Sequence, residues 1–284
     1  MDTLEQPSIP IIEQLKSPSL KIVPTPNDPP WNSWAAIGLW VFSVLMIMFV
    51  PAIFLVPYLV SSGVLKEGGE RIAEFSISDP TAVVLQMLGV IPAHIFTLVV
   101  AWMIVTRFRK YSFSEMLGFK SGGVRWWPYV IILIGFFALA AVVSQFFPEA
   151  ENQLTRILQS SRTAVFVVAF MATFTAPLVE EVVYRGVAYS AFQRSFGTAS
   201  AVIIVTLLFT SVHVPQYYES PSTILLLAIL SLILTLMRVF SGNLLPCVIF
   251  HTLINGVQSV GLIAEPYLKQ YFPADAAAIF LSLK

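Results

Sequence analysis

Two adjacent glutamates and an arginine interrupt an otherwise apolar stretch, PLVEEVVYRG (residues 177–186), and residues 164–179 before them carry no charge. Ionisable groups within bilayer-spanning helices are costly and usually mark a functional site. On a helix, Glu180 and Glu181 point about 100° apart, so they cannot do the same job. Glu181 and Arg185 are four residues apart with the acid first, the favourable order for an ion pair. We therefore predict that Arg185 holds Glu181 ionised and leaves Glu180 facing elsewhere.

Two further polar pairs follow at the same spacing on later apolar segments: Phe209 with His213, and His251 with Asn255. Residues at i and i+4 share a helix face, so the Phe209 ring can pack against one side of the His213 imidazole. Each pair has a plain alternative, because histidine and asparagine also serve as interhelical hydrogen-bonding groups. The plain alternative for the glutamates is an ion pair at a helix end, with Glu180 reaching the interface.

Taken together, a carboxylate, two imidazoles and a carboxamide suit hydrolysis of an amide by an activated water. A carboxylate beside a histidine can deprotonate water and later protonate the leaving amine. A second histidine and an asparagine amide can donate to the oxyanion of a tetrahedral intermediate. There is no G-x-S-x-G motif, and Cys247, one turn from His251, has no orienting partner nearby in sequence. His94 has no polar neighbour at helical spacing, and we interpret it as a packing residue.

The composition places these groups in a membrane. Of the 284 residues, 57% are hydrophobic and 11% are charged, against about 25% charged in a typical soluble domain. The formal net charge is zero, which indicates no preference for nucleic acid. A single cysteine excludes an intramolecular disulfide.

Seven apolar runs are long enough, or nearly so, to cross a bilayer, which takes about 20 residues per helix. The fifth is short for a full span, and the tail segment AAAIFLSL is too short unless it completes an eighth helix. We predict an all-α, polytopic membrane bundle of about seven to eight transmembrane helices. The runs cover residues 34–60, 80–106, 126–147, 164–191, 200–214, 221–240 and 244–263.

Four regions are expected along the chain. Residues 1–33 form a flexible, Pro-rich tail, and residues 34–163 form the N-terminal transmembrane helices and loops. Residues 164–264 form the helical core with the polar motifs, and residues 265–284 form a C-terminal segment. The loop from Arg107 to Arg125 carries five basic residues and one acid.

The loop between the first two runs, residues 61–79, carries two basic residues and four acids. The positive-inside rule therefore predicts that the N-terminus and the Arg107–Arg125 loop are cytoplasmic in a multi-pass protein of the plasma membrane. With the N-terminus and this loop in the cytoplasm, Glu180 and Glu181 are expected to lie in the cytoplasmic half of the membrane.

At these motifs the sequence resembles a known family. Glu-Glu-x-x-x-Arg, Phe-x-x-x-His and His-x-x-x-Asn, in this order on successive apolar helices, are similar to the CPBP (ABI) intramembrane glutamic endopeptidases. That family includes the type II CAAX prenyl endopeptidases and the bacteriocin-processing or immunity proteins. The resemblance covers about residues 164–264, and the motif positions are Glu180, Glu181, Arg185, Phe209, His213, His251 and Asn255.

The resemblance implies a bundle of about eight membrane helices with a conical cavity open to the cytoplasm and the lipid. It implies that Glu180 and His213 activate the water and that His251 and Asn255 form the oxyanion hole. Glu181 and Arg185 would support the site. The substrate would be a peptide or protein, lipidated or not, with no cofactor, no metal and no nucleic acid.

Two other readings stay open. Two histidines and a glutamate could hold zinc with an open position, although the H-E-x-x-H spacing is absent and no acid lies near either histidine in sequence. The protein could instead be a non-catalytic immunity or scaffold protein, or a transporter with an intramembrane proton relay. The sequence does not identify the peptide that is cut, and it does not indicate the oligomeric state.

Overall fold

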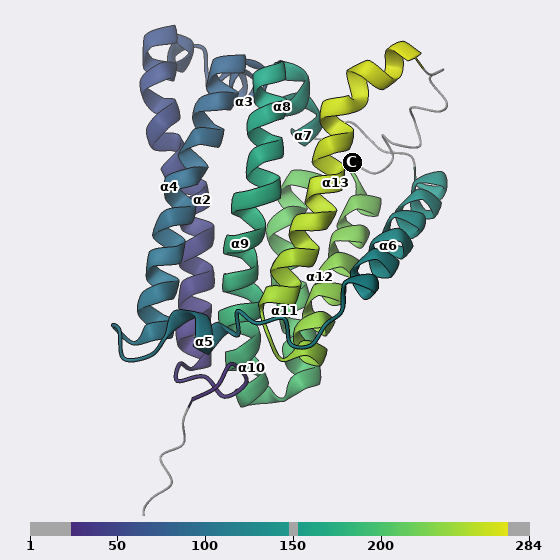
Figure 1. Cartoon of the computed structure of the whole chain (residues 1–284). Coiled ribbons are helices and arrows are strands. Elements are labelled where there is room, and N and C mark those ends of the chain that lie inside the picture. Colours follow the sequence, from purple (N-terminus) through teal and green to yellow (C-terminus); the bar gives the residue numbers. More distant parts are fainter. Residues whose placement is uncertain (1–23, 148–152, 272–284) are drawn as a thin grey trace, which may run out of the picture.

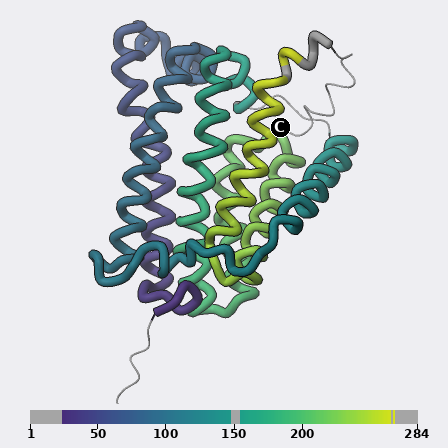
Figure 2. Tube along the Cα trace, viewed as in Figure 1, coloured from purple at the N-terminus to yellow at the C-terminus, as the bar shows by residue number. Residues whose placement is uncertain are grey.

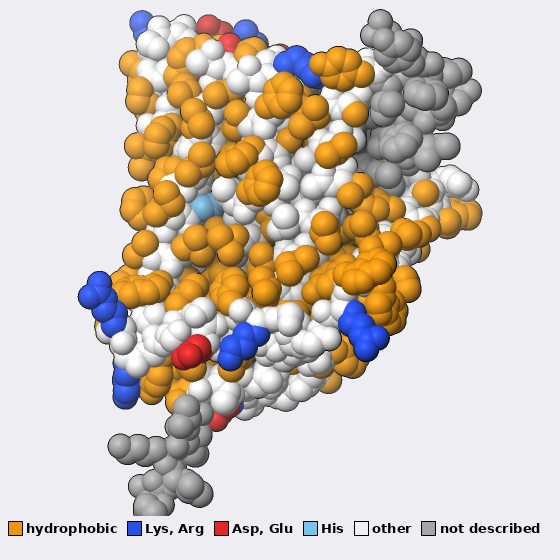
Figure 3. All heavy atoms as spheres, in the orientation of Figure 1, with side chains coloured by type: hydrophobic (Ala, Val, Ile, Leu, Met, Phe, Trp, Pro, Cys, Tyr) orange, Lys and Arg blue, Asp and Glu red, His pale blue; other side chains and the backbone are white. Residues whose placement is uncertain are grey.

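The structure is a computed structural model that describes residues 24–147 and 153–271. Over these residues the chain is all-helical, with one isolated β-bridge between Thr25 and Asp28. Within these described residues, seven helices are long and apolar enough to cross a membrane, and they stand side by side as a bundle (Figure 1). Apolar side chains form a broad band between two charged rims (Figure 3). The predicted polytopic helical bundle is confirmed, and the protein is an integral membrane protein.

The first two spans form a closely packed pair. Asn32 caps α2 (Ser33–Ser62) by accepting from the Ala35 amide, and Asp79 caps α4 (Pro80–Thr106) in the same way. The pair can approach closely because Gly89 has no side chain: a Cβ there would lie 2.6 Å from Pro51 Cα. The short helices η1 (Val64–Lys66) and α3 (Gly69–Ser78) connect the two spans. The tube view shows α2 and α4 running together along their whole length (Figure 2).

The third span is reached by a loop that contains the short helix α5 (Phe113–Leu117). The span itself is α6 (Trp126–Phe146), which leans away from the rest of the bundle in Figure 1. A short helix, α7 (Gln153–Ser160), then precedes the fourth span at the same end of the bundle as α3.

The fourth span, residues Arg162–Phe196, is one long helix with two wider, π-helical stretches. It consists of α8 (Arg162–Phe170), η2 (Met171–Thr175), α9 (Ala176–Glu181), η3 (Val182–Ala188) and α10 (Tyr189–Phe196). Both η2 and η3 are π-helices, and they flank the turn that carries the two glutamates. π-Bulges are rare and occur frequently at functional sites.

Three more spans complete the bundle: α11 (Thr198–Tyr217), α12 (Pro221–Ser241) and α13 (Leu245–Tyr271). α11 is longer than its apolar run predicts, and its 20 residues are enough for a full span. α12 ends at Gly242, which adopts φ 65° in the left-handed region where glycine is favoured. The tail segment AAAIFLSL lies outside the described residues.

The two ends of the bundle differ in charge. One end holds the Arg107–Arg125 loop, residues 24–32 and the end of α10, and we call it the basic end; it is the lower end in Figure 1. The other end holds α3, α7 and the connection between α11 and α12. We call it the acidic end; its acids are Glu67, Glu70, Glu74, Asp79 and Glu219, and its basic residues are Lys66, Arg71, Arg156 and Arg162.

Residues 24–32, assigned by composition to the tail, pack against the basic end of the bundle. Trp31 is 3% exposed, and its Nε1 donates to the Val187 carbonyl at 3.0 Å. Arg238, fully buried, donates from Nη1 to Asn27 Oδ1 at 2.8 Å and from Nη2 to the Pro26 carbonyl at 2.8 Å. The basic end is therefore closed by protein.

Candidate active site

The two glutamates of α9 face in different directions, as the helix geometry predicts. Glu181 is fully buried, and its Oε1 accepts from Arg185 Nη1 at 2.8 Å. Glu180 keeps 25% of its side chain exposed and lines a cavity. The predicted ion pair is thus present, and the other carboxylate is left for a separate role.

Arg185 is held by a second helix as well. Its Nη2 donates to the carbonyl of Ser231 at 3.0 Å and to the Ser231 hydroxyl at 2.8 Å, and its Nε donates to Thr235 Oγ1 at 3.3 Å. These α12 residues are fully buried. A buried charge is tolerated when it is paired and hydrogen-bonded, and Arg185 meets both conditions. The contacts to Ser231 and Thr235 could not be predicted, because the partners lie 46 and 50 residues away in sequence.

Phe209 of α11 separates this ion pair from the histidine on its own helix. The Arg185 guanidinium lies 4.8 Å from the centroid of the Phe209 ring, a cation–π distance. The His213 ring lies 4.8 Å from the same centroid, tilted by 32°. Phe209 is 1% exposed and is therefore a rigid wall between Arg185 and His213.

His251 of α13 connects the two glutamates. Its Nδ1 lies 2.8 Å from Glu181 Oε1, and because an ionised carboxylate only accepts, Nδ1 carries the proton. Its Nε2 lies 3.7 Å from Glu180 Oε2. Glu181 thus orients His251 as a carboxylate orients the histidine of a catalytic triad. The sequence did not reveal this bond, because it joins residues 70 positions apart.

His213 is oriented by its own helix. Its Nδ1 lies 2.8 Å from the Phe209 carbonyl. A carbonyl oxygen only accepts, so Nδ1 donates and the neutral ring has an unprotonated Nε2. His213 lines the same cavity as Glu180, so the acceptor nitrogen is available for a water molecule there.

Asn255 contacts the π-helix η2 through a carbonyl that the backbone leaves free. In η2 the Ala176 amide donates to the Met171 carbonyl, five residues back. The corresponding donor for the Ala172 carbonyl is residue 177, a proline without an N–H. Asn255 Nδ2 donates to this carbonyl at 2.8 Å. One amide hydrogen of Asn255 is therefore used to hold α13 on η2, and the second remains for another acceptor.

All four residues predicted to be catalytic line one cavity of about 240 Å³, although they come from α9, α11 and α13. Glu180, Phe209, Leu230 and His251 lie at its inner end. From there it follows α8, α11, α12 and α13 towards the acidic end, where Leu154, Leu158, Tyr217 and Thr223 line it. We call these last four residues the outer end of the cavity.

The direction of this cavity conflicts with one pair of expectations. The resemblance implies a cavity open to the cytoplasm, whereas the basic residues predict that the Arg107–Arg125 loop is cytoplasmic. The outer end of the cavity and this loop lie at opposite ends of the bundle. The two expectations exclude each other if the cavity opens at this outer end alone.

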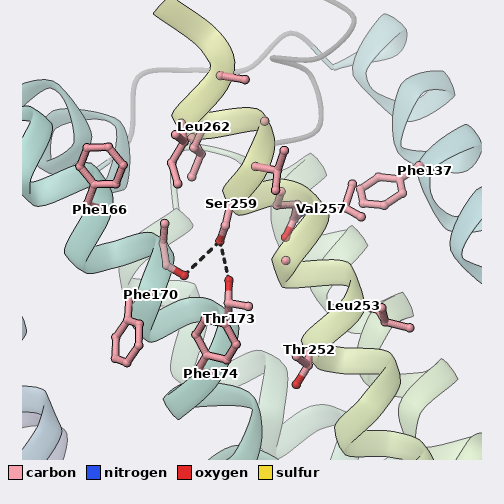
Figure 4. Close-up of a pocket in the computed structure, with 17 residues that line it drawn as sticks. Phe137, Phe166, Phe170, Thr173, Phe174, Thr252, Leu253, Val257, Ser259 and Leu262 are labelled. Carbon is pink, nitrogen blue, oxygen red and sulfur yellow. Dashed lines mark hydrogen bonds between the residues drawn. The ribbon is translucent and has the colours of Figure 1, made fainter.

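A larger apolar groove of about 750 Å³ lies on the other side of α13. Phe166, Phe170 and Phe174 line one wall of it and Phe137 of α6 lies opposite, with α13 between them (Figure 4). Ser259 fixes this part of α13, since its hydroxyl donates to the Ala169 carbonyl at 3.2 Å and accepts from Thr173 Oγ1 at 2.9 Å. The groove and the cavity share Phe137, Gln258, Ser259 and Leu262.

His94 is buried, as a packing residue would be. Its Nδ1 also lies 3.1 Å from Thr175 Oγ1 in η2, a partner that spacing on its own helix could not reveal. Among the described residues, no three His, Cys, Asp or Glu side chains are arranged to hold one metal ion.

Comparison with known proteins agrees with the motifs. A family model described as Type II CAAX prenyl endopeptidase Rce1-like matches residues 162–257, a range that contains every residue of the three motifs. No curated protein and no solved structure matches the chain. The resemblance seen in the motifs is thereby confirmed: residues 162–257, which carry all of the motif residues, match the type II CAAX prenyl endopeptidase, Rce1-like family model.

Proposed function

We propose that this protein is an intramembrane endopeptidase of the glutamic type, in which Glu180 and His213 activate a water molecule. The family implies a protease that acts on a peptide or protein. The observation that carries the mechanism is the convergence of Glu180, His213, His251 and Asn255 on one cavity from three helices.

The first step is attack of water on the carbonyl carbon of the scissile bond. Glu180, aided by the unprotonated Nε2 of His213, takes a proton from the water as its oxygen bonds to that carbon. The carbonyl oxygen becomes an oxyanion. Asn255 donates its remaining amide hydrogen to it, and a protonated His251 donates from Nε2 while Glu181 holds Nδ1.

The second step is collapse of the tetrahedral intermediate. The carbon–nitrogen bond breaks, and the amine leaves with the proton that Glu180 had accepted. The products are a carboxylic acid and an amine, which then exchange a proton to become a carboxylate and an ammonium, and the enzyme returns to its starting protonation state. Nothing in this cycle requires a metal or a cofactor.

The neighbouring apolar groove supports a substrate that is membrane-associated. Six aromatic or aliphatic side chains that line it are 41–67% exposed, so it can receive an apolar side chain or a lipid chain of the substrate. A prenylated C-terminal peptide and an unlipidated membrane peptide both fit this description.

The test is cleavage of a peptide panel, with and without a prenyl group, by the purified protein in detergent. We expect the wild-type protein to cleave at least one peptide and Glu180→Gln to cleave none. Glu70→Gln is the matched control, because Glu70 is an exposed glutamate of α3, and it should behave as wild type. Cleavage that is abolished by a strong chelator would favour the zinc alternative instead.

A non-catalytic role predicts a different result. If the protein is an immunity or scaffold protein, no peptide is cleaved and Glu180→Gln retains the full biological effect while folding and inserting normally. That outcome would refute the proposed mechanism.

A further inference from the structure

The direction in which Glu180 points depends on the two π-helices of the fourth span. Glu180 lies in α9, between η2 and η3. A π-helix closes its hydrogen bonds over five residues, where an α-helix closes them over four. Each π-helix therefore changes the rotation of α9 about the helix axis, η2 relative to α8 and η3 relative to α10. Whatever fixes η2 and η3 also fixes the orientation of the Glu180 carboxylate.

A side chain of α4 holds η2. The Met171 carbonyl accepts the π-type bond from the Ala176 amide and a second bond from the Thr175 hydroxyl at 3.3 Å. A threonine hydroxyl has only one hydrogen to donate. In its contact with His94 Nδ1 at 3.1 Å, the Thr175 oxygen is therefore the acceptor and His94 is the donor. His94 is thus connected, through Thr175, to the carbonyl that forms the π-type bond.

A side chain of α2 holds η3 in a corresponding way. The Tyr189 amide donates to the Tyr184 carbonyl, five residues back. The hydroxyl of Tyr184 accepts from Trp40 Nε1 at 3.1 Å, because an indole N–H only donates. Tyr184 is 5% exposed, and its ring centroid lies 5.2 Å from that of Phe209, the ring that packs against His213. Trp40 thus supports both η3 and the wall beside His213.

His94 and Trp40 do not contact the cavity. Neither they nor their acceptors, Thr175 and Tyr184, line it. α2 and α4 lie on one side of the fourth span and α13 lies on the other (Figure 1). Both residues also precede residues 162–257, which match the family model. Any effect of His94 and Trp40 on the reaction must therefore be exerted through the fourth span.

η2 is held from the side of α13 as well. Asn255 donates to the Ala172 carbonyl, which neighbours the Met171 carbonyl that is connected to His94. The bond from His94 therefore fixes the same turn that receives Asn255, one of the two expected oxyanion donors. A change at His94 reaches two groups of the site through η2, the Glu180 carboxylate and the Asn255 amide.

We propose that His94 and Trp40 are positioning residues of the peptidase, which hold η2 and η3 and thereby keep Glu180 pointing into the cavity. This inference rests on the proposed function. Loss of either bond lets one π-helix relax, and the carboxylate then turns relative to His213 and Asn255. Misplacement of a reacting group by about 1 Å can cost about 10²-fold in rate. We therefore expect a loss in kcat of that order with KM unchanged, because the residues that line the cavity stay the same.

Three substitutions of His94 test the bond to η2. His94→Ala removes the donor, and kcat should fall by about 10²-fold. Asparagine carries its amide nitrogen on Cγ, as histidine carries Nδ1, so His94→Asn should bring kcat back towards the wild-type value. Glutamine places its amide one carbon further out, so His94→Gln should not. Equal kcat values for the alanine, asparagine and glutamine variants would overturn the proposal.

The bond to η3 is tested from both of its ends. Trp40→Phe removes the donor and Tyr184→Phe removes only the acceptor hydroxyl, so the two variants should lose kcat to the same extent. The double variant should be no worse than either single one, because both lose the same bond. Independent, multiplicative losses would show that the hydrogen bond is not what matters.

Two controls show whether any loss of packing lowers kcat. Thr97 is a fully buried residue of α4 whose hydroxyl donates to the Ala93 carbonyl of its own helix at 2.9 Å. Trp34 of α2 is 79% exposed. Thr97→Val and Trp34→Phe should leave kcat at the wild-type value. A loss in either control equal to that of His94→Ala or Trp40→Phe would mean that these residues merely stabilise the fold.

Hydrogen–deuterium exchange in detergent tests the same claim without any peptidase activity. Amides open locally with their own free energies, and losing one hydrogen bond should speed exchange by about threefold to tenfold. We expect His94→Ala to speed exchange in η2 but not in η3, and Trp40→Phe to speed it in η3 but not in η2. Unchanged exchange in both, or an equal rise along the whole chain, would overturn the proposal.

The two measurements together separate this inference from the proposed function. If wild-type protein cleaves no peptide but exchange rises selectively in η2 and η3, the peptidase function is refuted while the hold on the π-helices stands. If wild-type protein cleaves a peptide and Glu180→Gln does not, but His94→Ala and Trp40→Phe retain full kcat, the peptidase function stands. The positioning role of His94 and Trp40 is then refuted.

Discussion

At the scale of single residues, Glu181 and Arg185 are buried behind the cavity, whereas the other five motif residues line it. Glu180 faces the cavity and Glu181 does not, because Glu181 receives Arg185 and His251 on the same oxygen. Phe209 separates Arg185 from His213. The i, i+4 spacings predicted the pairs within each helix. They could not predict contacts between helices, such as Glu181 with His251, because sequence spacing carries no information on distant partners.

The buried ion pair should matter far more than an exposed one of the same kind. Glu181→Gln and Arg185→Ala should each lower the free energy of unfolding by about 3–5 kcal/mol, because each leaves an uncompensated buried charge or donor. Denaturation in detergent micelles measures this. The control is Arg71→Ala, whose partners Glu67 and Glu74 are 54% and 63% exposed, with an expected loss below about 1 kcal/mol. Equal losses at both sites would contradict this.

Glu180 and His213 should act as one unit. If both serve the same water, Glu180→Gln and His213→Ala should each abolish most of kcat, and the double variant should be barely worse than either single one. The measurement is kcat of the two single variants and of the double variant, from steady-state kinetics in detergent on one peptide that the wild-type protein cleaves. Multiplicative losses in the double variant would show that the two residues act in separate steps.

The oxyanion donors should affect turnover more than binding. His251→Ala and Asn255→Ala should lower kcat by about 10²–10³, or 2.7–4 kcal/mol for each lost donor, with little change in KM. A rise in KM with kcat unchanged would assign these residues to substrate binding instead.

At the scale of elements, the sequence predicted the spans well and the irregularities poorly. The apolar run and the helix α4 have the same bounds, Pro80–Thr106, because Asp79 and Pro80 are a strong start signal. Hydrophobicity also located the other spans. The π-helices η2 and η3 were not predicted, because they widen the helix by one residue without changing its apolar character. Pro177 gives a physical reason for η2, because in a regular α-helix its ring would clash with the carbonyl of Thr173, four residues earlier.

Replacing Pro177 should change the hydrogen bonding of the Ala172 carbonyl in η2. Pro177→Ala supplies an N–H at residue 177 that can bond to the Ala172 carbonyl and compete with Asn255. We expect lower turnover without loss of stability, and we expect the stability cost of Asn255→Ala to be smaller in the Pro177→Ala background. A double-mutant cycle of unfolding free energies measures this coupling. Strictly additive effects would show that the two residues do not share this carbonyl.

At the scale of the whole molecule, the N-terminal segment is part of the bundle. Trp31 fills the basic end at 3% exposure, whereas Trp34, three residues later, is 79% exposed. Trp31→Ala should lower the free energy of unfolding by about 3–5 kcal/mol, because it leaves a cavity in a packed core. Trp34→Ala is the matched control and should change it little. Equal effects would mean that the segment does not seal this end.

The composition predicted a membrane protein, and the three motifs predicted which helices must converge. The motifs themselves did not predict in which direction the cavity extends, because no local pattern encodes which end of a bundle is filled. That depends on Trp31, Tyr189 and Arg238, which are far apart in sequence and meet only in the folded molecule.

The most direct test of the proposed peptidase is kcat/KM of Glu180→Gln on a peptide that the wild-type protein cleaves in detergent, measured beside Glu70→Gln. The substitution keeps the shape of the side chain and replaces the carboxylate by a neutral amide that cannot act as a base. We predict that kcat/KM of Glu180→Gln falls by at least about 10³, with the unfolding transition unchanged and Glu70→Gln equal to wild type. Retention of cleavage within about tenfold of wild type by a folded Glu180→Gln protein would contradict the assignment of Glu180 as the catalytic base.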